Sequence, residues 1–146
     1  MNVDTNRVIS HKQIITIFNI LRDIGLNTSH RGTKYLNKAV QILVIANNDI
    51  VAIKDVYNSI ANFYGNITPK QVKNDISYAL NSRTEEKTIK NFEKSFGFEY
   101  DQYYFTNKTI IEEIARVIKT RYYLTMNLLL NNTVFLLLVL FCCIEC

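Results

Sequence analysis

One short segment of the chain, residues 69–81, carries long polar side chains at a spacing that places them on one face of a helix. Lys, Gln and Asn are the side chains that reach phosphates and base edges in duplex DNA. An ordinary solvated helix face has the same composition, so the pattern by itself leaves both interpretations open. The candidate DNA-binding residues in and just before this segment are Thr68, Lys70, Gln71, Lys73, Asn74, Ser77 and Tyr78.

Residues that could support catalysis or bind a metal ion are not grouped in the sequence. His30 has no second His or Cys within residues 12–122 to share a metal. The three cysteines, Cys142, Cys143 and Cys146, lie together in the last five residues, so we expect a cytosolic body without a disulfide framework. There is no glycine-rich phosphate loop and no Ser-His-Asp order. We therefore expect no enzyme, no cofactor and no metal site.

Two predicted helices joined by a tight turn would position the candidate residues. The first covers about 50–64 and the second 69–81. Gly65 can adopt the positive φ of the turn. Thr68 is a good N-cap, a proline follows it at the first helical position, and Gln71 completes a capping box. This arrangement predicts a helix-turn-helix whose second helix presents the polar face.

The remaining periodicity predicts an all-α protein. Four Gly and one Pro leave little room for the turns of a β fold. An aromatic cluster at Tyr100, Tyr103, Tyr104 and Phe105 is expected to pack its loop onto the core rather than to stack on nucleobases. The predicted helices cover about 12–24, 32–47 with a break at 48–49, 50–64, 69–81, 85–96, and a sixth from Lys108 capped by Thr106 or Asn107.

The charge pattern is compatible with a polyanionic partner without proving one. The net charge is +4, and every Lys and Arg lies at or before Arg121. Arg31 and Lys34 open the second predicted helix and are candidates for contacts to the DNA backbone, which would add affinity and not specificity. A solvated helix end explains both residues equally well.

Four stretches, in order and at matching spacing, carry a family resemblance. They are Ile24-Gly25-Leu26 with Arg31-Gly32, Val56-Tyr57 with Ile60-Ala61, Ile76 to Leu80, and Phe96-Gly97-Phe98 with Thr106-Asn107. From about Lys12 to Tyr122 the chain resembles the C-terminal DNA-binding effector domain of the sporulation transcription factor family, stage zero sporulation protein A. The resemblance implies a six-helix domain whose fourth helix enters the major groove. It also implies a sequence-specific regulator of sporulation initiation.

The chain departs from this family in its fourth helix. The family has Arg at the positions of Gln71, Asn74 and Ser77, and Glu at that of Lys73. Since Arg pairs with guanine and Asn or Gln with adenine, the preference should shift towards adenine at the base pairs that Gln71 and Asn74 face. Asp75, an Ala in the family, adds a negative charge near the phosphates unless Lys38, Lys54 or a neighbour pairs with it.

The family also has a phosphorylatable receiver domain upstream. Only eleven residues precede the match here, so phospho-aspartate control is not expected. We predict a flexible N-terminus at 1–11, an effector domain at 12–122 and a hydrophobic helical tail at 123–146. The leading hypothesis is a cytoplasmic, nucleoid-associated regulator that binds double-stranded DNA as a pair on repeated sites. The alternative is an interaction protein without DNA binding, which pairs with a full-length regulator or is tethered to a membrane by its tail.

The tail itself admits three interpretations. Residues 124–144 are 21 residues without a charge, preceded by Lys119 and Arg121, which fits a membrane anchor with the domain in the cytoplasm. Asn127, Asn131 and Asn132 interrupt the apolar run and shorten its unbroken part. An oligomerisation helix and a degenerate C-terminus therefore compete with the membrane anchor.

Overall fold

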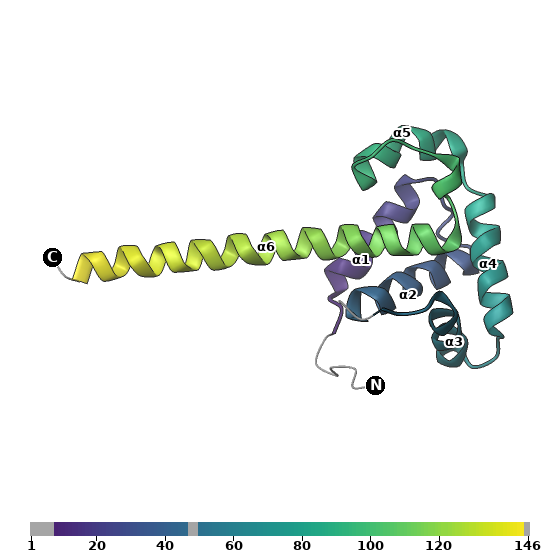
Figure 1. Cartoon of the computed structure of the whole chain (residues 1–146), viewed down its shortest axis with the longest axis horizontal. Coiled ribbons are helices and arrows are strands. Elements are labelled where there is room, and N and C mark those ends of the chain that lie inside the picture. Colours follow the sequence, from purple (N-terminus) through teal and green to yellow (C-terminus); the bar gives the residue numbers. More distant parts are fainter. Residues whose placement is uncertain (1–7, 47–49, 145–146) are drawn as a thin grey trace.

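The computed structural model describes residues 8–46 and 50–144, apart from the side chain of Tyr104, and is all-helical across them (Figure 1). This confirms the predicted fold class; the predicted break at 48–49 lies outside the described residues. The elements are α1 (His11–Asp23), α2 (Arg31–Ala46), α3 (Ile53–Tyr64), α4 (Pro69–Asn81), α5 (Glu85–Phe96), the short 3₁₀ helix η1 (Gln102–Tyr104) and α6 (Asn107–Ile144).

Two helices begin at reciprocal capping boxes. At α4 the Thr68 hydroxyl accepts a hydrogen bond from the backbone N–H of Gln71 at 3.2 Å, and the Gln71 amide oxygen accepts from the N–H of Thr68 at 2.8 Å. This confirms the capping box predicted for α4. At α1, Ser10 and Gln13 form the same pair of bonds, so this helix begins at His11. Both boxes satisfy backbone donors that a helix start would otherwise leave free.

α2 lies at the centre of the domain, packed against α1, α3, α4 and α6 (Figure 1). Leu36 and Val40 of α2 are fully buried, as are Ile60 of α3, Ile76 of α4 and Ile114 of α6. These apolar side chains recur every three or four residues along their helices, and burying such stripes is the main stabilising contribution to a helical domain. The two helices of the predicted helix-turn-helix are thus fixed to a common core.

An aromatic cluster packs α5 against the loop that precedes α6. Phe92 is buried, and its ring centroid lies 4.5 Å from that of Phe96 and 5.4 Å from that of Tyr100. Tyr100 and Phe105 pack against the core, as the sequence predicted for this loop. Tyr103 is exposed instead, and the side chain of Tyr104 lies outside the described residues.

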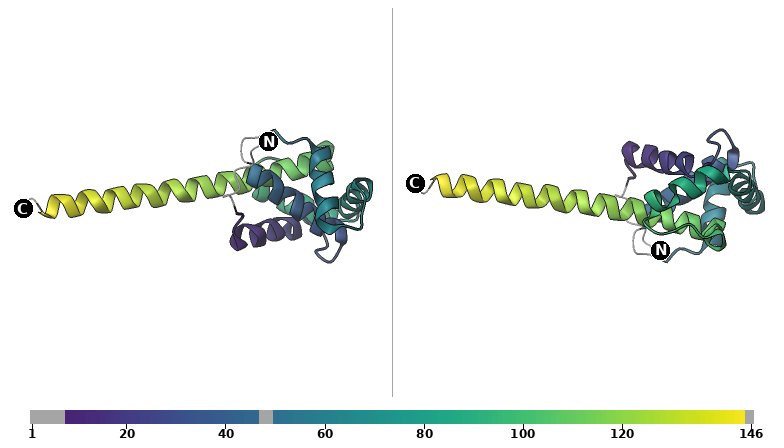
Figure 2. Two further views of the ribbon diagram at one scale, coloured as in Figure 1. Left: turned by 90° about the horizontal axis from the view of Figure 1, so that it is seen from below. Right: turned by 90° about the horizontal axis from the view of Figure 1, so that it is seen from above.

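The last helix leaves the domain without a break. Its buried residues run from Ile110 to Ile118, and it then continues to Ile144 as a rod that projects away from the domain (Figure 2). α6 therefore combines a core helix of the domain with the hydrophobic tail. The transition falls near Tyr122, which is half-buried against the core.

We expect residues 8–122 to fold without the tail, because the buried core residues that the structure describes lie between Ile17 and Ile118. The shortened chain should be helical by circular dichroism and should melt in one cooperative transition. A shortened chain that is unfolded while the full chain is folded would show that the tail contributes to the core.

Candidate nucleic-acid interface

The helix pair α3–α4 is joined by a turn of four residues, 65–68. Gly65 has a φ of 83°, and its N–H closes α3 by donating to the carbonyl of Ala61 at 2.9 Å. Ala61 is almost fully buried, and Val72 and Ile76 of α4 are completely buried. These three residues belong to the common core, and α3 and α4 pack against each other. The pair is therefore a helical hairpin that the core holds together.

The start of α4 presents polar side chains to solvent. Lys70, Lys73 and Asn74 are exposed. Gln71 is also exposed, but its amide oxygen is engaged in the capping box. Thr68 is engaged in the same box through its hydroxyl. Within the described part of the chain, three of the predicted contact residues thus have unpaired side-chain polar groups on one exposed stretch, and two hold the helix start.

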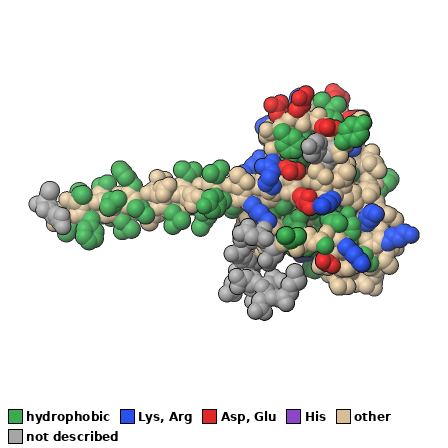
Figure 3. Space-filling model, in the orientation of Figure 1, with side chains coloured by type: hydrophobic (Ala, Val, Ile, Leu, Met, Phe, Trp, Pro, Cys, Tyr) green, Lys and Arg blue, Asp and Glu red, His purple; other side chains and the backbone are tan. Residues whose placement is uncertain are grey.

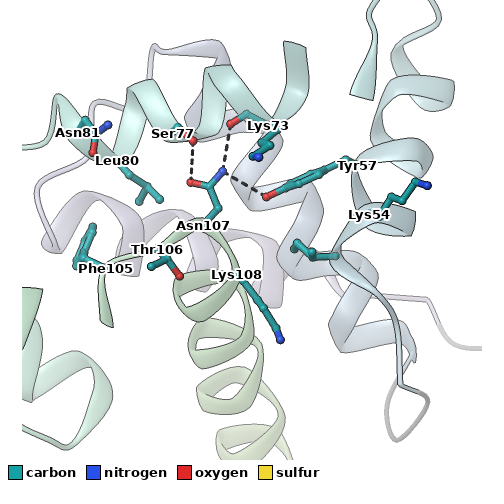
Figure 4. A pocket seen from close by; sticks show the side chains of 11 residues that line it. Lys54, Tyr57, Lys73, Ser77, Leu80, Asn81, Phe105, Thr106, Asn107 and Lys108 are labelled. Carbon is teal, nitrogen blue, oxygen red and sulfur yellow. Dashed lines mark hydrogen bonds between the residues drawn. The ribbon is translucent and has the colours of Figure 1, made fainter. Parts of the chain in front are cut away.

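Ser77 lies at the edge of this face, half-buried, and faces α6. Its hydroxyl donates to the side-chain oxygen of Asn107 at 3.2 Å (Figure 4). The amide nitrogen of Asn107 donates to the carbonyl of Lys73 at 3.1 Å and to the Tyr57 hydroxyl at 3.3 Å. Asn107 therefore connects the start of α6 to both helices of the hairpin.

Asn107 was not among the candidate site residues. The sequence marked it as a possible cap of the last helix and as part of the Thr106-Asn107 stretch that carries the family resemblance. Burial raises the pKa of the Tyr57 hydroxyl, and the hydrogen bond from Asn107 opposes that increase to a smaller extent. Tyr57 consequently remains a neutral acceptor of this bond at physiological pH.

An open cavity of about 630 Å³ lies beside α4, between α3 and the start of α6. Lys54, Lys73 and Lys108 line it from three different helices (Figure 4). Lys108 is within 3.9 Å of Glu112, which offsets its charge. On the face drawn in Figure 3, Lys and Arg side chains lie over α3 and α4 and also along α6 where it leaves the domain, while most acidic ones gather over α5. The hairpin thus presents basic side chains on this face, which favours contact with an anionic partner.

The start of α2 lies against the middle of α4. The guanidinium of Arg31 is 3.6 Å from the carboxylate of Asp75, so the partner of this acid is Arg31 and neither Lys38 nor Lys54. Lys34, one turn further along α2, is exposed. The ring of Tyr78 is mostly exposed and lies 5.6 Å from that of His30. Arg31 thus offsets the negative charge that Asp75 would bring to the interface.

Among residues 8–46 and 50–144, no three His, Cys, Asp or Glu side chains are grouped closely enough to bind a metal ion. The features that do converge are the rigid hairpin, its exposed polar face and the lysines beside it. These define a helix-turn-helix domain of the DNA-binding class.

Comparison with known families identifies the domain. Residues 17–118, more than half of the chain, match the family described as sporulation initiation factor Spo0A C terminal. The chain belongs to this family, whose members are DNA-binding transcription factor domains and not enzymes. Comparisons with curated proteins and with solved structures found no match.

Proposed function

We propose that this protein is a sequence-specific transcriptional regulator of the sporulation-initiation type, which contacts the major groove through α4. The observation that carries the proposal is the exposed start of α4, with Lys70, Lys73 and Asn74 on a hairpin that the core holds rigid. Rigid elements position base-contacting side chains better than loops do. The protein then acts in the cytoplasm, on the nucleoid, and needs no cofactor.

The side chains have different roles in this proposal. Asn74 contacts a base edge, and Lys70 and Lys73 contact phosphates. Arg31 and Lys34 contact the backbone beside the groove from the start of α2, with Arg31 also neutralising Asp75. Thr68 and Gln71 orient the helix start, Ser77 orients α4 through Asn107, and Tyr78 offers an apolar contact at the far end of the helix.

The adenine preference proposed from the sequence now rests on Asn74. An amide that pairs with adenine uses its oxygen and its nitrogen together. The capping bond holds the Gln71 side chain back towards the Thr68 N–H, so Gln71 would have to leave its cap to extend towards a base. Asn74 is exposed one turn further along and carries no such bond in the described part of the chain. We propose adenine opposite Asn74, within sites that two copies, or one copy and a full-length regulator, occupy together.

Removal of two exposed side chains tests the DNA contact. Lys73→Ala should weaken binding to all duplexes and reduce the slope of log affinity against log salt by about one. Asn74→Ala should leave binding to random duplex unchanged and weaken binding to library-selected sites by about 5- to 100-fold. Both should fold normally because both side chains are exposed. Fluorescence anisotropy with labelled duplexes over a range of salt concentrations measures each effect.

Lys90→Ala is the matched control, since it removes one exposed lysine from α5. It should change the salt dependence much less than Lys73→Ala does. Unchanged affinity in both α4 variants would overturn the proposal and would favour the alternative, an interaction protein that has lost DNA binding. Selected sites with guanine opposite Asn74, or without any consensus, would overturn the adenine preference alone.

A further inference from the structure

The tail half of α6 has no protein surface to pack against. In the part of the chain that the structure describes, α6 is the helix long and apolar enough to cross a membrane, and the apolar window within it is entirely unburied. On the face drawn in Figure 3, apolar side chains follow the projecting rod, with a few polar ones partway along it. A helix that is apolar on all sides is stable only inside a protein core or in a lipid bilayer. Because this part of α6 extends away from its domain, a lipid bilayer is the environment that fits it.

The dimensions of the tail match a bilayer. Residues 124–144 carry no charge, and at 1.5 Å per residue they span about 31 Å, close to the hydrocarbon thickness of about 30 Å. Every residue from 134 to 144 is apolar. Two such helices pairing in water would bury one stripe each and leave the other faces exposed. Lipid covers all of these faces at once.

The residues that precede the tail are those that mark a membrane boundary. Lys119 and Arg121 lie within the five residues that precede it, and the exposed Tyr123 comes directly before it. Aromatic residues are enriched at headgroup level, and basic flanks remain on the cytoplasmic side. With the basic flank on the cytoplasmic side, the effector domain lies in the cytoplasm, the compartment that contains DNA.

The polar side chains within the tail fall into two groups. The hydroxyls of Thr125 and Thr133 each donate to the carbonyl four residues earlier, at 2.8 Å, and so need no other partner. The three asparagines have no such bond among the described residues. Asn127 and Asn131 are four residues apart and share one face, whereas Asn132 lies about 100° around the helix from Asn131. An amide in hydrocarbon is stabilised by hydrogen bonding to a neighbouring helix.

We propose that residues 124–144 cross a lipid bilayer as a pair of helices from two copies of this chain, with Asn127 and Asn131 hydrogen-bonded across the pair. The anchor holds two effector domains close together at the membrane surface. This raises the effective concentration of the second domain when the first binds one of two repeated sites.

Flotation of the full chain with phospholipid vesicles, after an alkaline wash, tests the bilayer span. The unmodified chain should float with the vesicles. Leu136→Arg with Leu137→Arg, which puts charge near the middle of the span, should reduce the floating fraction by at least about tenfold. Leu124→Arg with Thr125→Arg, at the boundary, should float like the unmodified chain because these side chains reach the headgroups. An unmodified chain that stays in solution as an oligomer, or a mid-span variant that floats normally, overturns the proposal.

Energy transfer between donor- and acceptor-labelled copies in the same vesicles tests the pairing. Asn127→Leu with Asn131→Leu should make pairing about tenfold weaker while flotation is retained. Asn132→Leu, the control on another face, should pair normally. Equal pairing in all three proteins would overturn the role of the Asn127–Asn131 face. Neither readout involves DNA, so these results are independent of the proposed function.

Discussion

Gly32→Ala should destabilise the domain by about 3 kcal/mol or more, although alanine is the better helix former. A Cβ at position 32 would collide with the backbone carbonyl of Asp75 and lie 2.9 Å from the Cβ of Ala79. The obstacle is backbone, so α2 and α4 must move apart. Because α4 carries the proposed base contact, DNA affinity should fall together with stability.

Thermal unfolding followed by near-ultraviolet circular dichroism measures the loss. The chain has nine Tyr and no Trp, so this signal reports tyrosine packing and is insensitive to the tail helix. The midpoint should fall by roughly 10 °C or more. Lys34→Ala, an exposed substitution two residues further along α2, should leave it nearly unchanged. If the Gly32→Ala protein is as stable as the unmodified one, α2 and α4 do not approach each other as closely as the structure shows.

Phe92→Ala should have a comparable or larger effect, a loss of about 3–5 kcal/mol. Phe92 is 1% exposed, and its ring contacts four others, those of Phe96, Phe98, Tyr100 and Phe105. Its removal leaves a cavity at the centre of the cluster that attaches α5 to the start of α6. Since small domains are stable by only about 5–15 kcal/mol, this change should lower the denaturation midpoint strongly.

Ile89→Ala is the control on the same helix, because Ile89 is exposed and its removal creates no cavity. Chemical denaturation followed by tyrosine circular dichroism compares the two variants. Equal midpoints would mean that the aromatic cluster contributes nothing beyond surface packing. If Phe92→Ala is destabilised and its folded fraction still binds DNA normally, the cluster supports the hairpin only through overall stability.

Arg83 is the side chain that connects this cluster to the end of α4. Its guanidinium donates to the Leu80 carbonyl at 2.8 Å and to the Tyr100 hydroxyl at 2.9 Å, and lies over the ring of Phe105. The position of α4 is therefore fixed along its middle by the contacts of Asn107 and Gly32, and at its end by Arg83. Gly32→Ala and Phe92→Ala, the two mutations with the largest expected effects, both act on the contacts that position α4 and not on its exposed face.

The sequence by itself determined the helices and their ends. The capping box at Thr68 and Gln71, the turn at Gly65 and the apolar periodicity of α4 were all predictable, because each depends on residues within a few positions of one another. The family was also recognisable, since motif order and spacing extend over most of the chain. The uncharged tail was evident from composition alone, because the hydrophobicity of a segment depends only on its own residues and not on contacts with the rest of the chain.

Only the tertiary structure decided which of these helices meet and through which atoms. Gly32 was predicted as a helix start, yet its importance comes from the backbone of Asp75, more than forty residues away. Likewise Arg31 pairs with Asp75, and Asn107 connects Ser77, Lys73 and Tyr57. Helical periodicity shows that a face is buried, but it does not give the crossing position of the helix that covers it. Contacts between distant helices depend on that crossing, and so the polar bonds that orient α4 could not be predicted from the sequence.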